Sequence, residues 1–483
     1  MEKVSDNRQS VTSVTMDSKG QKLNLKREVG LVGAVSLIAG TMIGSGIFMS
    51  PQSVLFNIGS PGASLVIWAC CGLIALLGSL SYAELGTIIP ESGGEYIYML
   101  RTYGKVVAFM FVFSFIIVMR PASTTGIALS FAEYIVAPFY DGCTPPELVV
   151  KLVAAGALLV LAVINCMNVR LAMHIQMLTM VVKVLTLAVI ILGGMVMLFK
   201  GHTENFQEPF EGTDVRISSI GIAFYQVLWS YDGWNTLNYI TEELKCPEVN
   251  LPRAVLIAIS MVTVLYLLVN VSYFVVLTPR ELITSSAVAV TWGNKVLGDW
   301  GWIMSVAAAL SAFGSLNGSF FSGGRVCFVA AREGHMPDIL SMAHVHRLTP
   351  SPALIFTTII SLVVLIPGDF ESIVNFFSFT SWFFYGVTLS GLLYLKIKKP
   401  ELHRPYKVPI VIPILILIAA VGLVLAPIVD NPQIEYLYVT LFIFSGVLVY
   451  VPFIHYKLCP GLLRKVTIIL QLFLEVAPAE KNL

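Results

Sequence analysis

Charged residues are scarce in this sequence of 483 residues. Only 12% of the residues are Asp, Glu, Lys or Arg, and 56% are hydrophobic, whereas a soluble domain has about 25% charged and about 45–50% apolar residues. So few charges cannot cover the surface of a water-soluble protein. The formal net charge is only +1, which excludes nucleic acid as a partner, because non-specific affinity for phosphates comes from an excess of Lys and Arg. The composition predicts a protein whose solvent is a lipid bilayer.

Several motifs that carry chemistry are also missing. The sequence contains no Walker A motif, no GxSxG motif and no zinc signature, so neither an ATPase nor a hydrolase is supported. His174 and His335 have no metal-ligand partner at a useful spacing. We therefore expect no enzymatic activity, no cofactor and no metal. The polar segment 1–29 has no apolar core of a signal peptide, which predicts an N-terminal tail.

Apolar runs long enough to cross a bilayer recur along the rest of the chain. A hydrocarbon core of about 30 Å needs roughly 20 apolar residues in a helix, and such runs alternate with charged or Pro/Gly-rich breaks. We predict an all-α membrane protein with about twelve transmembrane helices, near 30–57, 62–88, 104–137, 147–167, 170–199, 217–243, 252–277, 301–331, 351–366, 372–397, 407–428 and 433–456. The membrane domain thus covers 30–456, and the tail 457–483 contains an amphipathic helix near 462–476.

Basic residues sort onto alternate connections between these spans. Lys and Arg gather near 22–27, 101–105, 170, 245–253, 332–347, 396–407 and 457–465, whereas the other connections carry mainly Asp and Glu. Cytoplasmic loops of membrane proteins carry the excess of Lys and Arg. Both chain termini are therefore predicted to be cytoplasmic.

Two of the spans are interrupted at corresponding places. The first contains Gly44-Ser45-Gly46, and the sixth contains Ser230-Tyr231-Asp232-Gly233. Broken helices five spans apart are typical of inverted-repeat transporters, whose binding site lies at the midplane between the half-helix ends. Alternatively, the glycines only allow close helix packing. Matched breaks favour the first interpretation, with repeats at about 30–199 and 217–397 and two further helices at 407–456.

Longer motifs identify a family resemblance. They are Gly40–Phe48 (GTMIGSGIF), Ser81–Gly86 (SYAELG), Ser92–Tyr96 (SGGEY), Trp229–Asn235 (WSYDGWN), Thr241–Glu243, Arg332–His335 and His403–Pro405. Together they resemble the light-chain subunits of heteromeric amino-acid transporters in the amino acid–polyamine–organocation (APC) superfamily. The segment 229–240 is most similar to the b-zero-plus type, which exchanges cystine and dibasic amino acids for neutral ones.

The resemblance covers nearly the whole chain beyond the N-terminal tail. It implies a LeuT-like fold of two inverted five-helix repeats with helices 1 and 6 broken. It also implies a plasma-membrane protein, apical in epithelia, whose partner is a single-span type II glycoprotein heavy chain, called rBAT for this type.

An α-amino acid substrate needs N–H donors for its carboxylate and carbonyl acceptors for its ammonium, and a broken helix supplies both. The resemblance places the donors on the first break, which comprises Thr41, Met42, Ile43, Gly44, Ser45 and Gly46. The acceptors are the carbonyls of 226–231. Glycine at the break permits close approach of the backbone.

The side chain of the substrate would be recognised by residues of the sixth and tenth spans. Asp232 is an intramembrane acid, and such acids are functional candidates by default. Its expected partner is a cationic substrate side chain or the distal ammonium of cystine, and the alternative is a helix N-cap. Asn235 and Ser381 are expected to line the same pocket. The resemblance assigns Trp229 as a gate that covers the substrate from outside, and the alternative is core packing.

Two of the cations within predicted spans are candidates for function. Lys183 must pair or line a cavity, and the resemblance implies that it fills the site of a sodium ion, which predicts sodium-independent exchange; the alternative is a lysine that snorkels to the interface. Arg120 could attract an acidic substrate, as in the cystine/glutamate exchanger that the third span also resembles. However, that exchanger carries a second arginine where Ser381 stands. The role of Arg120 stays open.

The cysteine count of seven leaves one residue over, which suggests an intermolecular disulfide. Only Cys143 falls in a predicted extracellular loop, and thiols on the cytoplasmic side stay reduced. It matches the position of the heavy-chain disulfide in the family.

The leading hypothesis is therefore a sodium-independent exchanger of cystine and cationic amino acids against neutral ones. The alternatives are a cystine/glutamate-type exchanger, a neutral amino-acid exchanger, and a non-transporting amino-acid receptor. A channel would need a continuous polar stripe or selectivity ring, whereas the polar groups here concentrate at two helix breaks.

Overall fold

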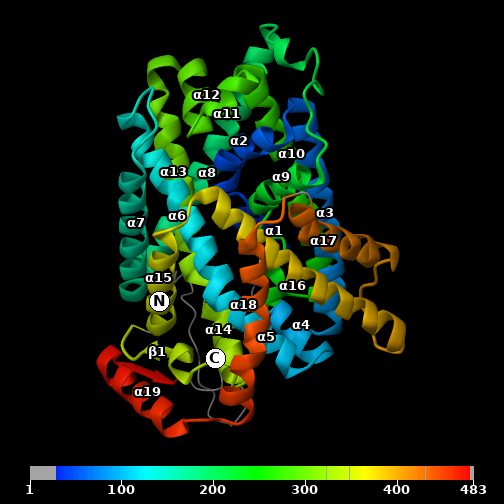
Figure 1. Ribbon diagram of the computed structural model, residues 1–483, viewed down its shortest axis with the longest axis vertical. Coiled ribbons are helices and arrows are strands. Elements are labelled where there is room, and N and C mark those ends of the chain that lie inside the picture. Colours follow the sequence, from blue (N-terminus) through cyan, green and yellow to red (C-terminus); the bar gives the residue numbers. More distant parts are fainter. Residues whose placement is uncertain (1–28, 323, 348, 430, 479–483) are drawn as a thin grey trace, which may run out of the picture.

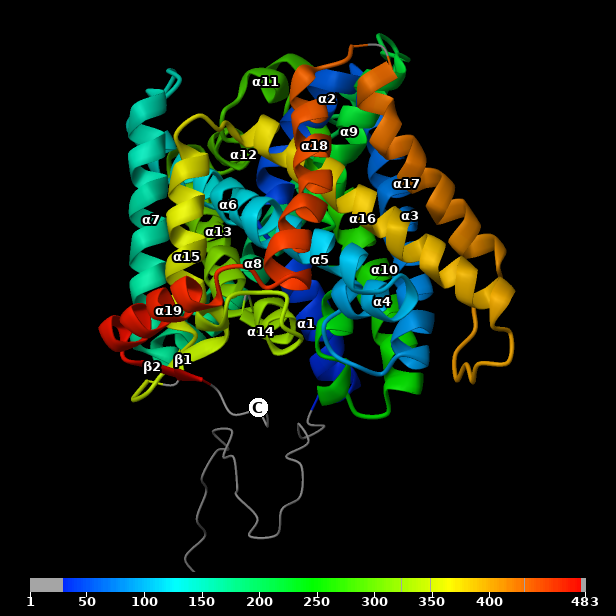
Figure 2. The ribbon, with the colours of Figure 1, turned by 60° about the horizontal axis from the view of Figure 1, so that its bottom comes forward.

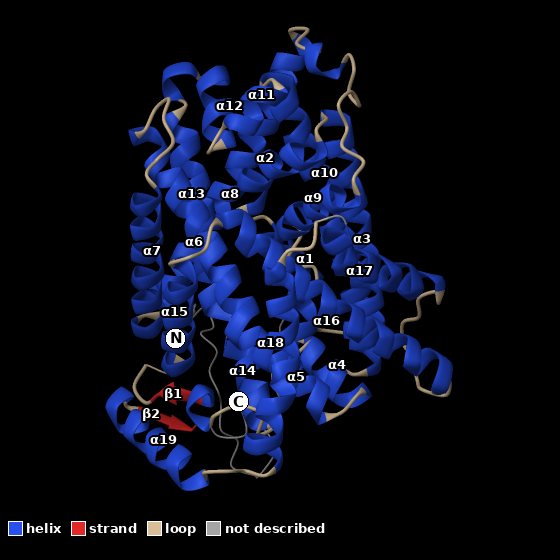
Figure 3. Ribbon diagram, viewed as in Figure 1, coloured by secondary structure: helices blue, strands red, loops and turns tan. Residues whose placement is uncertain are grey.

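The computed structural model describes residues 29–478 except Gly323, Leu348 and Asp430, so nearly all of the predicted N-terminal tail lies outside the described residues (Figure 1). The described chain is almost entirely helical, and its two short strands lie beside α19 (Figure 3). The prediction of an all-α membrane protein is confirmed.

Nine helical segments of the described chain are long and apolar enough to cross a membrane. They are built from α3 (Pro61–Ile88), α5 (Lys105–Ser114) joined to α6 (Arg120–Val136), α7 (Glu147–Met167), α8 (Val169–Phe199), α10 (Pro247–Val276), α13 (Trp302–Ser322), α16 (Phe370–Lys398), α17 (Val411–Val429) and α18 (Ile434–Tyr450). A tenth span is the pair α1 (Leu31–Met42) and α2 (Gly46–Ile58), bent by 49°. Two shorter apolar helices, α9 (Ile217–Ser230) and α15 (Ser351–Leu365), complete the twelve positions that the apolar runs predict.

The connections contain shorter elements. The short helices are α4 (Glu95–Thr102), α11 (Pro279–Thr284), α12 (Val288–Val296), α14 (Gly324–Arg332) and α19 (Pro460–Leu474). The 3₁₀ turns cover Ala137–Phe139, Glu204–Phe206, Thr236–Tyr239, Thr241–Glu243, Gly298–Trp300 and Asp338–Ser341. The π turns cover Phe115–Met119 and Val451–His455. Strands β1 (Met342–His344) and β2 (Val476–Pro478) pair antiparallel. In Figure 2, α4 and α19 lie toward the lower end of the molecule, and α11 lies toward the upper end.

Large apolar side chains remain exposed along the outer helices. Leu159 of α7, Leu192 of α8 and Leu441 of α18 have exposed fractions of 49%, 60% and 57%, and Figure 2 shows α7 and α17 at opposite edges of the bundle. Monomeric soluble proteins rarely expose apolar patches of this extent. The apolar rim therefore faces lipid, and the chain is a multi-pass membrane protein.

Candidate functional site

Both predicted helix breaks are present in the described chain. The first lies between the end of α1 at Met42 and the start of α2 at Gly46. In the second, α9 ends at Ser230, and the chain continues through a turn into the 3₁₀ segment Thr236–Tyr239. The second half of the sixth span is thus two short 3₁₀ turns and not the half-helix that the repeat pattern predicts, because side chains of other elements bind this segment.

The two breaks lie against each other. A Cβ atom on Gly46 would stand 2.7 Å from the Cα atom of Ser230, and one on Gly233, whose φ is +105°, would stand 2.6 Å from Cγ2 of Thr41. Only glycine fits at either contact. The close approach places the end of α1, the start of α2 and the end of α9 around one point.

A tyrosine hydroxyl joins the two breaks. The Tyr266 hydroxyl of α10 lies 2.6 Å from the carbonyl oxygen of Met42 and 2.7 Å from that of Ser230, where α1 and α9 end. Carbonyls at a helix C-terminus have no intrahelical donor, so this hydroxyl satisfies them from a third helix. Tyr266 lies within an apolar run, and no pattern in the sequence distinguishes it.

The first break offers N–H donors over a shorter segment than predicted. Thr41 and Met42 belong to α1, and the N–H of Ile43 donates to the carbonyl of Ala39 at 2.9 Å. The N–H groups of Gly44 and Ser45 immediately precede α2, and that of Gly46 begins it. At such a helix start the N–H groups have no partner within the helix, and the dipole is positive. A carboxylate suits this position.

The carbonyl acceptors at the end of α9 are partly used. The oxygens of Leu228 and Trp229 accept from the N–H groups of Tyr231 and Asp232 at 3.1 and 3.2 Å, and that of Ser230 accepts from Tyr266. A carbonyl oxygen has a second lone pair. The end of α9 therefore retains acceptor capacity for an ammonium group.

Asp232 follows directly after α9 and is half-buried. Its charge interacts with the charges of Glu95 and Arg120. The N-cap of the next helical turn is Asn235, but the Asp232 carboxylate accepts a hydrogen bond from the backbone N–H of Gly233. Asp232 thus lies in the unwound segment with a neighbouring N–H group as a partner, although it does not hold the N-cap position itself.

Asn235 lies in the unwound segment, and Ser381 lies on α16. Ser381 is 2% exposed and lies beside Tyr385, whose ring contacts that of Trp234 at 5.0 Å between centroids. The Asn235 side chain donates its Nδ2–H to Oε1 of Glu95. Asn235 is therefore engaged with α4, whereas Ser381 lies on α16 beside Tyr385.

Glu95 is the second functional candidate that the sequence interpretation missed. It stands within Ser92–Tyr96, a motif that carries the family resemblance but to which no role in the site was assigned. Its side chain is 1% exposed, and its Oε2 accepts a hydrogen bond of 2.6 Å from the Tyr239 hydroxyl. Glu95 and Asp232 thus bring two carboxylates to the second break.

Trp229, near the end of α9, packs against α6 and α16. Its ring meets those of Phe370 and Phe377 edge to face, at centroid distances of 6.0 and 5.2 Å, and a Cβ on Gly126 would stand 3.1 Å from it. The side chain is 7% exposed. A gate and a core residue both fit this packing.

Lys183 of α8 is buried behind the first break. Its Nζ donates to Oγ of Ser315 at 3.0 Å and to the carbonyl oxygen of Gly40 at 3.4 Å. At 1% exposure it does not reach an interface, so the snorkelling alternative is wrong. The ammonium joins α1, α8 and α13.

The remaining predicted residue, Cys143, lies far from the breaks in sequence. It is an exposed free cysteine in the loop that follows Ala137–Phe139 and precedes α7. This loop lies at the end of the molecule opposite to α19 (Figure 2). Within the described residues, no group of three or more His, Cys, Asp or Glu could hold a metal ion.

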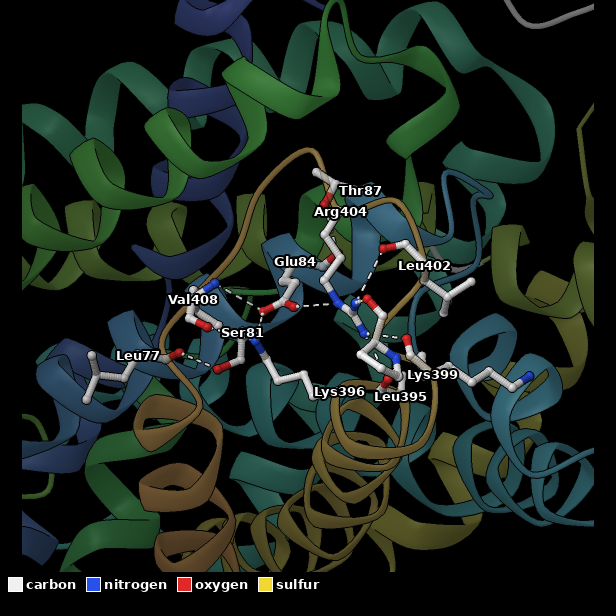
Figure 4. Close-up of polar contacts among 11 residues, drawn as sticks. Leu77, Ser81, Glu84, Thr87, Leu395, Lys396, Lys399, Leu402, Arg404 and Val408 are labelled. Atoms are coloured by element: carbon white, nitrogen blue, oxygen red, sulfur yellow. Dashed lines mark hydrogen bonds and ion pairs between the residues drawn. The ribbon is translucent and has the colours of Figure 1, made fainter.

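Glu84 of α3 forms a separate network, shown in Figure 4. Its Oε2 lies 2.9 Å from Nζ of Lys396 and accepts from the N–H of Val408 at 3.1 Å, and its Oε1 lies 3.4 Å from Nε of Arg404. Arg404 also donates to the carbonyls of Leu395 and Lys399 at the end of α16. This network holds three elements together outside the substrate site.

Comparison with known proteins agrees with the geometry. The family model "Amino acid permease" matches residues 29–452. The chain is 49% identical to the b(0,+)-type amino acid transporter 1 of Homo sapiens over 95% of both chains. It is 42% identical to the Cystine/glutamate transporter of Homo sapiens over 96% of this chain and 93% of the relative. It is 44% identical to the Large neutral amino acids transporter small subunit 2 of Homo sapiens over 85% and 77%.

Each of these relatives is a transporter, and this chain is likewise a transporter and not an enzyme. The relatives are amino acid transporters by name, and this chain is an amino acid transporter of the membrane. With a family model that spans nearly the whole sequence and relatives of this identity, the chain belongs to the amino acid permease family.

Proposed function

We propose that this chain takes up cystine and cationic amino acids in sodium-independent exchange for neutral amino acids, by alternating access. The observation that carries the proposal is the charge at the second break, where two carboxylates, Asp232 and Glu95, stand against the one guanidinium of Arg120. Such a site gains most from a substrate that brings a compensating positive charge.

The backbone recognises the part that all amino acids share. The N–H groups of Gly44, Ser45 and Gly46 bind the substrate carboxylate at the start of α2, and the carbonyls that end α9 accept from its ammonium. Half-helix ends that face a midplane site bind charged groups in this way. Cationic and neutral substrates therefore share this part of the site.

The side-chain pocket separates the substrates. Asp232 pairs with a guanidinium, with an ammonium, or with the distal ammonium of cystine, while Ser381 and Asn235 form its polar wall. A glutamate side chain would add a third negative charge to the two carboxylates, which disfavours the cystine/glutamate alternative. Arg120 offsets only one of them.

Around the breaks, residues of α1 are exposed and residues of α2 are buried. Residues Ser36, Leu37 and Thr41 of α1 are exposed, whereas Ile47 and Phe48 of α2 are buried. Trp229 covers the site on the buried side. These contacts support a state that opens along α1 toward the cytoplasm, with α1 and α2 in the first of the two inverted repeats, 30–199 and 217–397.

Lys183 supports the absence of sodium coupling. Its ammonium contacts the carbonyl of Gly40 beside the first break, where a cation binds in sodium-coupled relatives of the fold. A fixed positive charge at this position occupies the place of the ion. Replacement of sodium by choline is expected to leave uptake unchanged.

The same reasoning gives a partner and a location. The relatives include a chain named a small subunit, which supports a larger partner, and we assign it as an rBAT-like heavy chain joined at Cys143. The complex lies in the plasma membrane, apical in epithelia, with both termini of this chain cytoplasmic. A Cys143→Ser chain that still runs as the high-mass species on a non-reducing gel contradicts the disulfide.

One experiment tests the central proposal. The purified full-length chain is reconstituted in liposomes preloaded with leucine, and uptake of labelled arginine, cystine, glutamate and leucine is measured in sodium and in choline. We expect arginine and cystine to enter only against internal leucine, in both salts. Glutamate uptake that exceeds arginine uptake would favour the cystine/glutamate alternative, and leucine uptake alone would favour the neutral exchanger. Binding without counterflow would indicate a receptor.

A further inference from the structure

Helix α4 is fastened to the unwound segment of the sixth span by a series of hydrogen bonds. The N–H of Gly94 donates to the carbonyl of Asn238 at 3.2 Å. Ser92 and Glu242 bind reciprocally, because the N–H of each donates to the side chain of the other at 3.1 and 3.3 Å. The cytoplasmic loop 92–95 is thus fixed against the segment 235–242.

The glycine pair before α4 brings Glu95 into this contact. Gly93 and Gly94 have φ values of +127° and +56°, and a Cβ on Gly94 would stand 2.6 Å from the ring of Tyr239. Glycine adopts this backbone without strain, unlike other residues. The turn starts α4 directly beneath the second break and buries Glu95 as its first residue.

Both oxygens of Glu95 accept hydrogen bonds. Oε1 accepts from the amide of Asn235 and Oε2 from the hydroxyl of Tyr239. Both donors stabilise the ionised form of the carboxylate, which can only accept. In its ionised form, Glu95 adds a negative charge next to Asn235, which lies three residues along the chain from Asp232.

We propose that Glu95 is a specificity-determining residue of the substrate site, which supplies the second negative charge that selects substrates with a cationic side chain. The inference rests on the proposed function and deepens it. Glu95 does not contact the substrate: it fixes Asn235, and its charge keeps the site anionic although Arg120 offsets Asp232. A neutral site would bind cationic and neutral substrates alike.

Arginine and citrulline separate charge from shape, because citrulline has nearly the same shape without the positive charge. Exchange of both is measured for the full-length chain in liposomes preloaded with leucine. Glu95→Gln removes the charge while its amide still fits between Asn235 and Tyr239. We expect the KM for arginine to rise roughly tenfold, as expected for one charge at short range in a medium of intermediate dielectric constant. The KM for citrulline and leucine should change less than about twofold.

Two variants control for structure. Glu95→Asp keeps the charge and is expected to keep the preference for arginine over citrulline. Glu91→Gln makes the same change in the same loop, at an exposed carboxylate that pairs with Arg101 at 2.8 Å, and should leave all three substrates unchanged. Tyr239→Phe removes one donor but no charge, so arginine and citrulline should change together.

The results separate this inference from the proposed function. If the unmodified chain exchanges arginine but Glu95→Gln lowers arginine and citrulline in proportion, or changes neither, Glu95 is only structural and the inference is overturned while the function stands. If Glu95→Gln does not fold, Tyr239→Phe and Glu95→Asp still decide, because a loss of arginine preference in Glu95→Asp contradicts a charge effect. If the unmodified chain does not exchange arginine, the proposed function fails and the inference with it.

Discussion

Two regions of this protein bury carboxylates within the bundle, and they differ in how the charge is balanced. Glu84 faces two cations, Lys396 and Arg404, and a backbone N–H (Figure 4). At the second break, the charge of Asp232 interacts with one guanidinium, that of Arg120, and with a second carboxylate, that of Glu95. We call the Glu84 network complete, because its carboxylate is paired without a ligand, and the second break incomplete, because the described groups named there include two carboxylates but one guanidinium.

This difference in charge balance distinguishes a structural network from a candidate binding site. A buried charge is tolerated when it is paired and hydrogen-bonded, and removal of its partner leaves a costly uncompensated charge. The Glu84 network therefore holds α3 to the end of α16. An excess of charge at a midplane site instead favours a ligand that supplies the missing cation.

The largest expected effect comes from breaking the complete network. Glu84→Gln leaves Lys396 and Arg404 without their counter-charge, and we expect the free energy of unfolding to fall by about 3–5 kcal/mol. Thermal unfolding of the purified protein measures this loss. Lys396→Met is the control, because Glu84 then keeps Arg404 and the Val408 N–H and the loss should be smaller. A decrease below about 1 kcal/mol for Glu84→Gln would show that the network is dispensable.

The incomplete region should respond in transport and not in stability. Asp232→Asn removes the partner of a cationic side chain, which costs on the order of 2–5 kcal/mol in arginine transport if the ion pair is well desolvated. Leucine exchange should persist, and thermal unfolding should change little. Arginine and leucine uptake are measured side by side and corrected for the amount of protein. Proportional loss of both substrates would return Asp232 to a structural role.

The fold was largely predictable because the bilayer imposes a simple rule on the sequence. Apolar runs of about 20 residues mark the spans, and glycines within two of them mark the breaks. The 3₁₀ segment Thr236–Tyr239 was not predictable, because its shape depends on Ser92, Gly94 and Glu95, which lie about 140 residues away in the chain. The local sequence pattern does not indicate contacts with residues so distant in the chain.

The candidate site could be predicted only at residues whose type is rare in their surroundings. Asp232 and Lys183 are charges within apolar spans, and that rarity alone identifies them. Glu95 looks like a loop residue, and Tyr266 looks like one more aromatic residue of an apolar helix. Their roles follow from distances, 2.6 Å to Tyr239 for the former and 2.6 Å to Met42 for the latter.

Substitution of Tyr266 is expected to have an effect of intermediate size, because its uncharged hydroxyl joins the two breaks. Tyr266→Phe keeps the ring contacts with Trp68 and Tyr231 but leaves two helix-end carbonyls without their donor, which we expect to cost about 1–3 kcal/mol in unfolding. Exchange of arginine and leucine should slow in proportion, since both use the shared part of the site. Tyr273→Phe on the same helix, whose hydroxyl bond is 3.4 Å long, should have a smaller effect. Selective loss of arginine would contradict this reading.

The smallest effect is expected where an ion pair is exposed to water. Lys295 and Glu281, in the segment after α10, form a contact of 2.5 Å with both side chains 40% exposed. Solvent screens such a pair, and Lys295→Ala should lower the free energy of unfolding by less than about 1 kcal/mol at neutral pH. The hydrogen bond from Lys295 is the main cause that lowers the pKa of Glu281 below its ordinary value of 4.5.

The pH dependence of this small effect has a definite sign. Because the pKa of Glu281 is lower in the folded state, its pairing stabilises the protein fully above pH 4.5 and is lost as the pH falls through the folded pKa. The difference between the unmodified chain and Lys295→Ala should therefore be present at pH 7 and shrink on acidification below 4.5, and it should also shrink in high salt. Thermal unfolding at several pH values measures it. A loss as large as that of Glu84→Gln would show that burial does not decide the strength of these ion pairs.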